Sequence, residues 1–341
     1  MEYGKIVEQY GTPIFIFNKK NLKETYRKFD KEVSEYLKDY KIFFSVKTNS
    51  NKKVLKVLSE MGSGFEVASE RELESVKDFN NEKIYNGPCK KRFVDGILYN
   101  VDSVSEMKKL AESGKNEIGI RVSFEEGKFG IESERILEAF KRAKEMGLIP
   151  KGISSHPGTQ IRKIEEYKKY IGNLKEIAEE LDKNGFNIEF IDVGGGFPDK
   201  YSRKSSQNQL SKYFEILTRL NDYRIYLEPG RALVSESLEL ITRVEYIKKK
   251  NGNKYAICNA GINLIPKITL SRYKFEKISD SKGENERYIL AGPLLFGNDI
   301  LHKSWNGHLE EGDYIKIKNV GAYCLELAWR LSYDIPDLVE I

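Results

Sequence analysis

Residues 41–50 read KIFFSVKTNS, and this stretch raises the main structural question about the chain. Ile42, Phe43 and Phe44 form an apolar run that is typical of a buried strand, and Lys47 follows at its far end. Lysine is rarely buried without a partner, because an unpaired charge in a protein interior is costly. These residues alone leave two interpretations open: Lys47 extends from the strand end into solvent, or its amine is a reactive group that forms a Schiff base.

From residue 41 onward, short apolar strands alternate with amphipathic helices. We expect strands at 42–48, 64–69, 83–87, 97–103, 118–123, 152–158, 190–196 and 225–230. Helices are expected between them, including 132–146 and 163–183, where apolar residues recur at helical spacing. Alternation of this kind is typical of parallel βα units, so the pattern predicts an α/β protein with a (β/α)8 barrel.

The two ends of the chain show a different pattern. Residues 11–18 read as a strand and 20–38 as a helix, and hairpins follow after about residue 235, one of them turning at Asn251-Gly252. We therefore predict a barrel domain over 20–235. A second, all-β domain resembling a sandwich or barrel would consist of 236–341 and be completed by the N-terminal strand within 1–19.

Composition excludes several classes of protein. The 341 residues are 40% hydrophobic and 32% charged, and the net charge of +5 is spread over Lys/Glu-rich helices, which argues against a nucleic-acid surface. We find no apolar run near the roughly 20 residues of a membrane span and no signal peptide, so we expect a cytoplasmic protein. The cysteines and histidines lack metal-ligand or disulfide spacing, so no metal is expected.

Chemically distinctive residues follow the predicted strands. The active site of a barrel of this kind lies at the C-terminal ends of its strands. The residues expected there are Lys47, Glu66, Ser69, Arg121, His156, the glycines 194–196, Glu228 and Arg231.

Two motifs indicate what this site could bind. DVGGGFP (192–198) exposes backbone N–H groups that could hold a phosphate, although a glycine triplet is also compatible with a simple tight turn. EPGR (228–231) ends a strand at Pro229 and places Glu228 near Arg231, either as a structural ion pair or as site residues. A lysine, an anion cradle and a carboxylate together suit pyridoxal phosphate, whose ring nitrogen the carboxylate would keep protonated.

A family resemblance covers almost the whole chain. Its motifs occur in order: residues 43–76, RVSFEEGKFGI (121–131), SSHPGTQ (154–160), DVGGGFP, LEPGRALV (227–234), NAGINLI (259–265), GPLLFGNDIL (292–301) and VGAYCLELA (320–328). They resemble the alanine-racemase-fold pyridoxal-phosphate decarboxylases, the group of diaminopimelate, ornithine and arginine decarboxylases.

The resemblance implies a role for each matching residue. Lys47 would be the Schiff-base lysine, His156 would stack on the cofactor ring, Glu228 would pair with the pyridine nitrogen and Arg121 would lie near the ring oxygen. The phosphate would be held by Thr159, Gly194, Gly195, Gly196, Gly230, Arg231 and Tyr323. From the residues alone, His156 could also be an ordinary histidine and Tyr323 a core tyrosine.

The sequence departs from the family pattern in the predicted substrate pocket, which would contain Asn259, Leu295, Phe296 and Asp299. Leu295 stands where the family carries a cysteine, which the partner subunit supplies. Phe296 stands where the family carries an acidic residue that recognises a distal amine of the substrate. Asn259 replaces an aspartate and Ile265 an arginine. We therefore expect a substrate whose far end is uncharged or conjugated. Another group would return the Cα proton; Cys258 and Cys324 are candidates, although a structural role suits both better.

The resemblance thus predicts a homodimeric decarboxylase with shared active sites that acts on an amino acid or amino-acid conjugate. A racemase on the same fold is the first alternative. It is disfavoured because the racemases place an arginine, rather than a carboxylate such as Glu228, at the pyridine nitrogen. An inactive cofactor-binding homologue is the second, and the presence of Lys47, Glu228 and the glycines argues against it.

Overall fold

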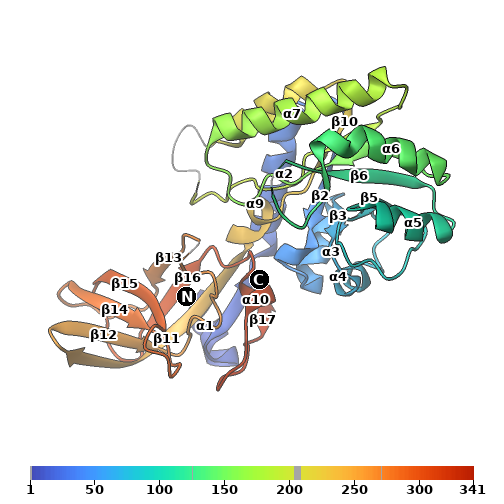
Figure 1. Ribbon diagram of the computed structural model, residues 1–341. Coiled ribbons are helices and arrows are strands. Elements are labelled where there is room, and N and C mark those ends of the chain that lie inside the picture. Colours follow the sequence, from blue (N-terminus) through green and yellow to red (C-terminus); the bar gives the residue numbers. More distant parts are fainter. Residues whose placement is uncertain (1, 125, 203–208, 270) are drawn as a thin grey trace. The chain divides into compact units, whose positions relative to one another are not determined.

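The computed structural model describes residues 2–124, 126–202, 209–269 and 271–341. The chain divides into two compact units (Figure 1). Lys23–Leu233 form the first, called the barrel unit here, and Met1–Leu22 with Val234–Ile341 form the second, called the β unit. The domain boundaries predicted from the sequence, 20–235 for the barrel and 1–19 with 236–341 for the second domain, remain a proposal.

Parallel strands of the barrel unit form a closed barrel, which confirms the predicted fold. Within the described residues its eight strands are β2 (Tyr40–Ser45), β3 (Gly64–Val67), β4 (Lys83–Tyr85), β5 (Ile97–Val101), β6 (Glu117–Ser123), β8 (Ile149–Ser154), β9 (Phe190–Asp192) and β10 (Arg224–Leu227). They pair in chain order, and the pairing of β10 with β2 closes the ring. The short β7 (Ile131–Glu132) pairs with β6 outside this ring.

Helices follow most strands and lie outside the barrel (Figure 1). They are α2 (Lys19–Ser34), α3 (Lys52–Glu60), α4 (Glu70–Ser75), α5 (Val104–Glu112), α6 (Ile136–Glu145), α7 (Ile164–Lys183), α8 (Leu210–Leu217) and α9 (Arg231–Val234). Asn51, Ser69 and Ser103 cap α3, α4 and α5 by accepting a backbone N–H. Across the residues that the structure describes, no helix is long and apolar enough to cross a membrane.

Several strands end earlier than predicted. β2 ends at Ser45, so Lys47 lies in the short 3-10 helix η1 (Val46–Thr48) rather than in the strand. β9 ends at Asp192, because Gly194 and Gly196 adopt positive φ angles of 67° and 85° that a strand does not accommodate. The residues with site chemistry therefore stand on turns just beyond the strand ends.

Aromatic side chains fill the barrel interior near the N-terminal ends of the strands. Phe43, Ile84, Phe190 and Tyr226 form one buried cluster. The rings of Phe190 and Tyr226 stack with centroids 4.7 Å apart and an interplanar angle of 14°. Gly152 leaves room for the Phe190 ring, since a Cβ atom there would lie 2.7 Å from the ring atom Cδ2. This end of the barrel is therefore a packed core.

The β unit is built on a mixed sheet in the order β13-β16-β11-β12-β14-β15. Its strands are β1 (Ile14–Phe17), β11 (Leu238–Lys250), β12 (Asn253–Cys258), β13 (Lys274–Lys277), β14 (Glu286–Ala291), β15 (Ile300–Gly307), β16 (Tyr314–Lys318) and β17 (Leu338–Glu340). β1 pairs with β11 and β17, so the N-terminal strand completes this unit as predicted. β11 and β12 form the expected hairpin, with positive φ at Asn251 and Gly252.

The description of this unit as all-β was incomplete. It also contains α1 (Glu2–Tyr10) and the short α10 (Cys324–Leu327). Tyr3, Ile6 and Val7 of α1 pack against Ile14 and Ile16 of β1 and against Ile241 of β11. Tertiary packing thus stabilises a nine-residue helix that would be marginal in isolation.

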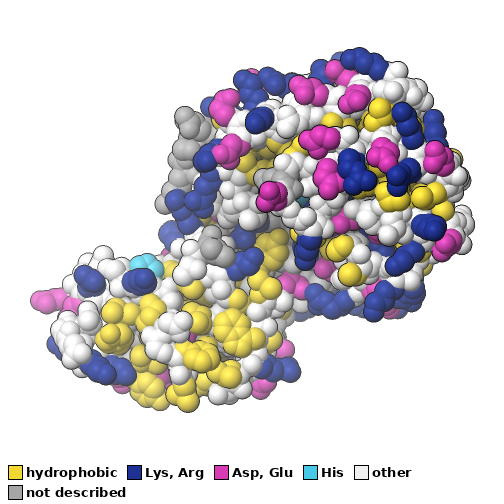
Figure 2. Space-filling view, viewed as in Figure 1, with side chains coloured by type: hydrophobic (Ala, Val, Ile, Leu, Met, Phe, Trp, Pro, Cys, Tyr) yellow, Lys and Arg dark blue, Asp and Glu magenta, His cyan; other side chains and the backbone are white. Residues whose placement is uncertain are grey.

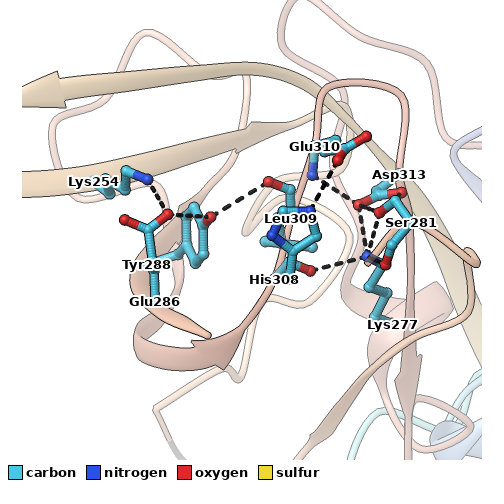
Figure 3. A network of polar contacts seen from close by, with 9 residues as sticks. All are labelled: Lys254, Lys277, Ser281, Glu286, Tyr288, His308, Leu309, Glu310 and Asp313. Atoms are coloured by element: carbon cyan, nitrogen blue, oxygen red, sulfur yellow. Dashed lines mark hydrogen bonds and ion pairs between the residues drawn. The ribbon is translucent and has the colours of Figure 1, made fainter. Parts of the chain in front are cut away.

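A polar network fixes the connection before β16 (Figure 3). The buried Asp313 carboxylate accepts hydrogen bonds from Ser281 at 2.6 Å and from the Glu310 N–H at 2.8 Å, and it pairs with Lys277 at 3.0 Å. Burial by itself would raise the pKa of Asp313, but these hydrogen bonds and the charge of Lys277 bring it below its ordinary value. Nearby, the Glu286 carboxylate accepts hydrogen bonds from the Lys254 ammonium group and from the Tyr288 hydroxyl.

Phe190→Ala should destabilise the protein by about 3–5 kcal/mol, because it removes a ring from a packed layer and leaves a cavity. The measurement is urea unfolding followed by circular dichroism. Ile149→Ala is the control, since the side chain of Ile149 is exposed in the same barrel and its loss should change stability little. Equal effects of the two substitutions would contradict the packed interior.

Candidate functional site

Lys47 has a carboxylate partner at the mouth of the barrel. Its ammonium nitrogen lies 3.0 Å from Oε2 of Glu66, which projects from β3 and is completely buried. The Ser45 hydroxyl donates to the same oxygen. Burial would raise the pKa of Glu66, but the charge of Lys47 and the hydrogen bonds from Ser45 and Lys47 bring it below its ordinary value. The lysine side chain keeps 37% of its surface exposed, so its amine is both paired and accessible.

The turn that carries Lys47 packs against the EPGR turn. The Ser45 N–H donates to the Pro229 carbonyl at 3.3 Å. A Cβ atom at Gly230 would lie 2.1 Å from the Thr48 hydroxyl oxygen, so only glycine permits this approach. The turns that follow the first and last barrel strands, β2 and β10, thus lie side by side. Lys47 belongs to the turn after β2 and Glu228 to the turn after β10.

The glycine triplet forms a bare backbone surface beside His156. A Cβ atom at Gly194 would lie 2.5 Å from the Ser155 carbonyl oxygen, and one at Gly195 would lie 2.4 Å from the Glu228 carbonyl oxygen. The Gly195 N–H donates to His156 Nδ1 at 3.3 Å, which leaves the other ring nitrogen to carry the proton. The Gly194 N–H donates to Asp192 Oδ1 at 2.9 Å, so what the triplet offers an anion is mainly close approach to a backbone without side chains.

His156 is neutral at neutral pH. His156 is exposed at the mouth, yet crowding by protein atoms and the positive charges of Lys47 and Arg121 lower its pKa to about 4. Arg121 lies 3.6 Å from Asp102 and stacks on the Phe129 ring, its guanidinium carbon 4.6 Å from the centroid. Arg121 and His156 line one cavity of about 120 Å³.

Glu228 is buried, and its hydrogen-bond partners are an amide and a carboxyl. Its Oε1 accepts from Asn86 at 2.5 Å, and its carboxyl shares a hydrogen bond with Asp192. Asn100 donates to both Asn86 at 2.8 Å and Asp192 at 3.0 Å. Burial, followed by the charges of Asp192 and Glu66, raises the pKa of Glu228 well above its ordinary value. A basic ring nitrogen would supply the cationic partner that this carboxyl lacks among these contacts.

Sequence reasoning did not assign roles to Glu66, Asn86, Asn100 or Asp192. Each lies at the C-terminal end of an apolar barrel strand or in the residue after it. A polar residue at that place was the available signal, and for Asp192 it stood inside the quoted DVGGGFP motif. The signal is weak because the same position also suits a turn residue.

Two further predicted residues of the barrel unit lie near these groups in the chain. Arg231 is buried at the start of α9, directly after Gly230. Thr159 is exposed in a loop whose Ile161 N–H donates to the Gly196 carbonyl at 3.0 Å. The structure thus brings Lys47, His156, the glycine triplet and Glu228 to one mouth, with the Thr159 loop on the triplet.

The remaining predicted residues belong to the β unit. Tyr323 has a positive φ of 66°, a strained conformation for an aromatic residue. Asn259 joins Thr242 to Thr12 by hydrogen bonds, and Asp299, only 2% exposed, accepts the N–H groups of Ile262 and Leu294 at 2.8 Å. These contacts give Asn259 and Asp299 structural roles, and a contact with substrate remains a proposal for both.

The loop between β14 and β15 presents its apolar residues to solvent. Leu295 is 94% exposed and Phe296 is 44% exposed, whereas Leu294 is buried beneath them. By contrast, Cys258 and Cys324 are buried in the β unit, and burial raises the pKa of the Cys258 thiol to about 12. A buried thiol of that kind is a poor proton donor to a substrate.

A larger cavity, of about 520 Å³, lies at the opposite end of the barrel. Its charged side chains pair with neighbours in its own wall: Lys41 with Glu82 at 2.5 Å, and Asp30 with the Tyr40 hydroxyl at 2.8 Å. Barrel enzymes place their chemistry at the other end, where the strands finish. We therefore assign the site to the mouth that contains Lys47.

Comparisons with known proteins agree with this site. Residues 19–235 match the family model described as the pyridoxal-dependent decarboxylase, pyridoxal binding domain. A diaminopimelate decarboxylase from Vibrio cholerae is 29% identical, with 93% of this chain and 84% of that protein covered. One from Archaeoglobus fulgidus is 28% identical, with 94% and 85% covered.

Solved structures show the same architecture. A diaminopimelate decarboxylase from Helicobacter pylori, crystallised with L-lysine, matches with a TM-score of 0.88 at 28% identity, covering 96% of this chain and 90% of that one. A lysine/ornithine decarboxylase from Vibrio vulnificus matches with a TM-score of 0.88 at 21% identity, covering 100% and 97%, and supports the fold alone. The chain therefore belongs to the pyridoxal-phosphate-dependent decarboxylases and is an amino-acid decarboxylase resembling the diaminopimelate enzymes.

Proposed function

We propose that this enzyme removes the α-carboxylate of an amino acid or amino-acid conjugate in the cytoplasm, using pyridoxal phosphate held at the mouth of the barrel. The main supporting observation is the contact between the turn that carries Lys47 and the turn that carries Glu228. It brings an accessible amine and a buried carboxyl to the same mouth as the glycine triplet. These groups fit the aldehyde, the ring nitrogen and the phosphate of the cofactor.

Bound pyridoxal phosphate supplies an electron-accepting ring that takes up the electron pair when the carboxylate leaves as carbon dioxide. Lys47 would hold the cofactor covalently, and Glu66 would keep the amine at the mouth whenever the substrate replaces it. Glu228 would hold the proton on the ring nitrogen. A carboxyl at this place favours decarboxylation over racemisation, since it maintains the ring as a strong electron acceptor.

The other residues would orient the cofactor. The neutral His156 would lie against the ring face, where an uncharged imidazole avoids repulsion with a protonated ring. Arg121 would lie near the ring oxygen. The phosphate would be bound by Gly194, Gly195, Gly196, Gly230, Arg231, Thr159 and Tyr323 through backbone N–H groups and side chains.

We propose a homodimer in which each copy completes the active site of the other. The β unit exposes large apolar side chains, including Leu295, Phe296, Leu327, Leu331 and Tyr333. Figure 2 shows hydrophobic side chains gathered on one face of this unit, whereas charged side chains are spread over the barrel unit. An exposed apolar set of this kind favours burial by a second protein surface.

The tip formed by Leu295 and Phe296 also bears on the substrate. If it enters the partner's pocket, apolar side chains face the distal end of the substrate. A distal ammonium would be buried there without a partner, at a high cost in free energy. We therefore propose a substrate whose far end is uncharged or conjugated, which distinguishes this enzyme from its diaminopimelate-decarboxylase relatives.

Lys47→Ala should abolish covalent cofactor attachment and turnover while the fold is retained. Borohydride reduction followed by mass spectrometry measures the attachment, and circular dichroism reports the fold. Lys163→Ala is the control, because the Lys163 side chain is 76% exposed on the barrel unit. Normal turnover in Lys47→Ala would refute the assignment of the cofactor lysine.

Glu228→Gln should leave the cofactor bound but lower kcat by about 10²–10³-fold, since a preorganised electrostatic partner is lost. Carbon dioxide release under saturating substrate gives kcat, and the visible absorbance of the protein gives cofactor occupancy. A wild-type rate at full occupancy would show that Glu228 is not the partner of the ring nitrogen.

The proposal about the substrate predicts that acylating the distal amine raises kcat/KM. The test compares lysine, ornithine and diaminopimelate with analogues acylated at that amine. Leu295→Cys/Phe296→Glu is the reverse variant, and it should shift the preference toward the free amines. A free diamino acid that wins by a wide margin in the wild-type enzyme would contradict this pocket while leaving the decarboxylase activity established.

A further inference from the structure

Four side chains at the mouth form a closed cycle of hydrogen bonds, called the carboxyl–amide cycle here: Glu228, Asn86, Asn100 and Asp192. The amide of Asn100 uses both of its N–H groups, donating to Asn86 Oδ1 at 2.8 Å and to Asp192 Oδ2 at 3.0 Å. Because Asn86 accepts through its oxygen, its amide nitrogen points to Glu228 Oε1, at 2.5 Å. The hydrogen bond between Glu228 and Asp192 closes the cycle.

The direction of each hydrogen bond in the cycle is determined. Asp192 accepts from the Gly194 N–H at 2.9 Å and from Asn100, both of which can only donate. Both oxygens of Asp192 thus accept hydrogen bonds, whereas Asn86 donates to Oε1 of Glu228 and leaves Oε2 to carry the proton of the pair. Two carboxyls in hydrogen-bond contact do not both ionise readily, so the pair retains one proton over a wide pH range.

The backbone around the cycle is also fixed. Lys90 is buried, pairs with Glu106 at 2.6 Å, and donates to the carbonyl groups of Gly87 at 2.7 Å and Asn100 at 2.9 Å. It thereby ties the loop after β4, which carries Asn86, to the end of β5, which carries Asn100. The Glu228 N–H donates to the Gly194 carbonyl at 2.9 Å, which links the ends of β9 and β10.

We propose that Asp192 is a positioning residue that acts through Glu228. Linked to Glu228 through Asn100 and Asn86, it keeps the Glu228 carboxyl oriented and places its own negative charge behind it, so that the ring nitrogen of the cofactor holds its proton more tightly. This inference rests on the proposed role of Glu228. It extends that role, because two carboxyls and two amides, rather than Glu228 alone, would then determine how tightly the ring nitrogen holds its proton.

Other ionisable groups near the pair act in both directions. Glu66 from β3 adds negative charge and Lys47 from η1 adds positive charge. The Tyr170 hydroxyl from α7 donates to the Val193 carbonyl at 3.2 Å, and the charges of both carboxyls help to keep it protonated. Burial is the largest cause that raises the pKa of Asp192, to about 6. Asp192 thus differs from Glu66, which is ionised, and from Glu228, which carries the shared proton.

The test follows the protonation of the ring nitrogen in the holoenzyme, using ¹⁵N-labelled pyridoxal phosphate and nitrogen NMR over a pH series. Asp192→Asn should lower the pH at which the ring nitrogen loses its proton by about one to three units, the usual effect of a nearby charge. Asn86→Asp, which adds an acid to the cycle, should shift it in the opposite direction. Glu72→Gln is the control, since the buried Glu72 accepts the Ala68 N–H instead of a group of the cycle.

Opposite shifts in the two variants support the proposal, because a merely structural defect would not move the titration in two directions. The proposal would be overturned if the ring nitrogen lost its proton at the wild-type pH in both variants. Failure of the proposed function looks different: the wild-type protein itself would then show no cofactor bound through Lys47.

Thermal unfolding of the full chain without cofactor provides a second measurement. Because the folded-state pKa of Asp192 is raised from 3.8 to about 6, its stabilising contribution is complete at low pH and is lost as the pH rises through that interval. Asp192→Asn should therefore reduce the decline of Tm over this range relative to the wild-type chain. An unchanged decline would contradict the placement of an ionisable Asp192 in the cycle.

Discussion

The ion pair between Lys47 and Glu66 makes the rest of the site possible. A lysine at the end of a buried strand is tolerated here because a completely buried carboxylate lies 3.0 Å away on the neighbouring strand. The buried Glu66 carboxylate depends on this amine and on the Ser45 hydroxyl for its charge. The pair leaves the amine partly exposed at the mouth. The same place that gives Lys47 a partner therefore also keeps its amine within reach of a cofactor.

The same mouth concentrates buried carboxyls in a way that stability alone does not favour. The charges of Asp192 and Glu66 raise the cost of ionising Glu228, the charge of Glu66 raises that of ionising Asp192, and backbone and amide donors offset only part of this cost. An arrangement of this kind is typical of functional sites, where strain is retained because the chemistry depends on it. A cationic ring nitrogen would relieve the repulsion, which couples cofactor binding to the stability of the barrel.

The two units show different kinds of specificity. The barrel unit contains the groups that suit the cofactor, and these match the decarboxylase family in order along the chain. The β unit carries the exposed tip of Leu295 and Phe296, anchored from below by Asp299 through the Leu294 N–H. Under the proposed function, chemistry and substrate choice can change separately, since the tip can vary without disturbing the carboxyls of the barrel.

Local sequence was sufficient for the barrel. Strand and helix periods are properties of short segments, so the alternation from residue 41 predicted the (β/α)8 architecture, and the glycine-rich turns indicated where chemistry occurs. Strand ends were less predictable: β2 stops at Ser45 because the next residues turn into η1, a choice made by contact with Gly230 rather than by local preference. The helix α1 was missed for a similar reason, since it depends on packing against β1 and β11.

The sequence by itself determined the fold class, the family and the residues that stand at the strand ends. Only the tertiary structure decided their partners. Asn86 meets Glu228 across 142 positions of the chain, and Asn100 meets Asp192 across 92. Closing a barrel brings all strand ends to one mouth, but which side chains meet there depends on strand order and on the direction of each turn. Those long-range contacts leave no periodic trace in the sequence, and for that reason the carboxyl–amide cycle is visible only in the folded chain.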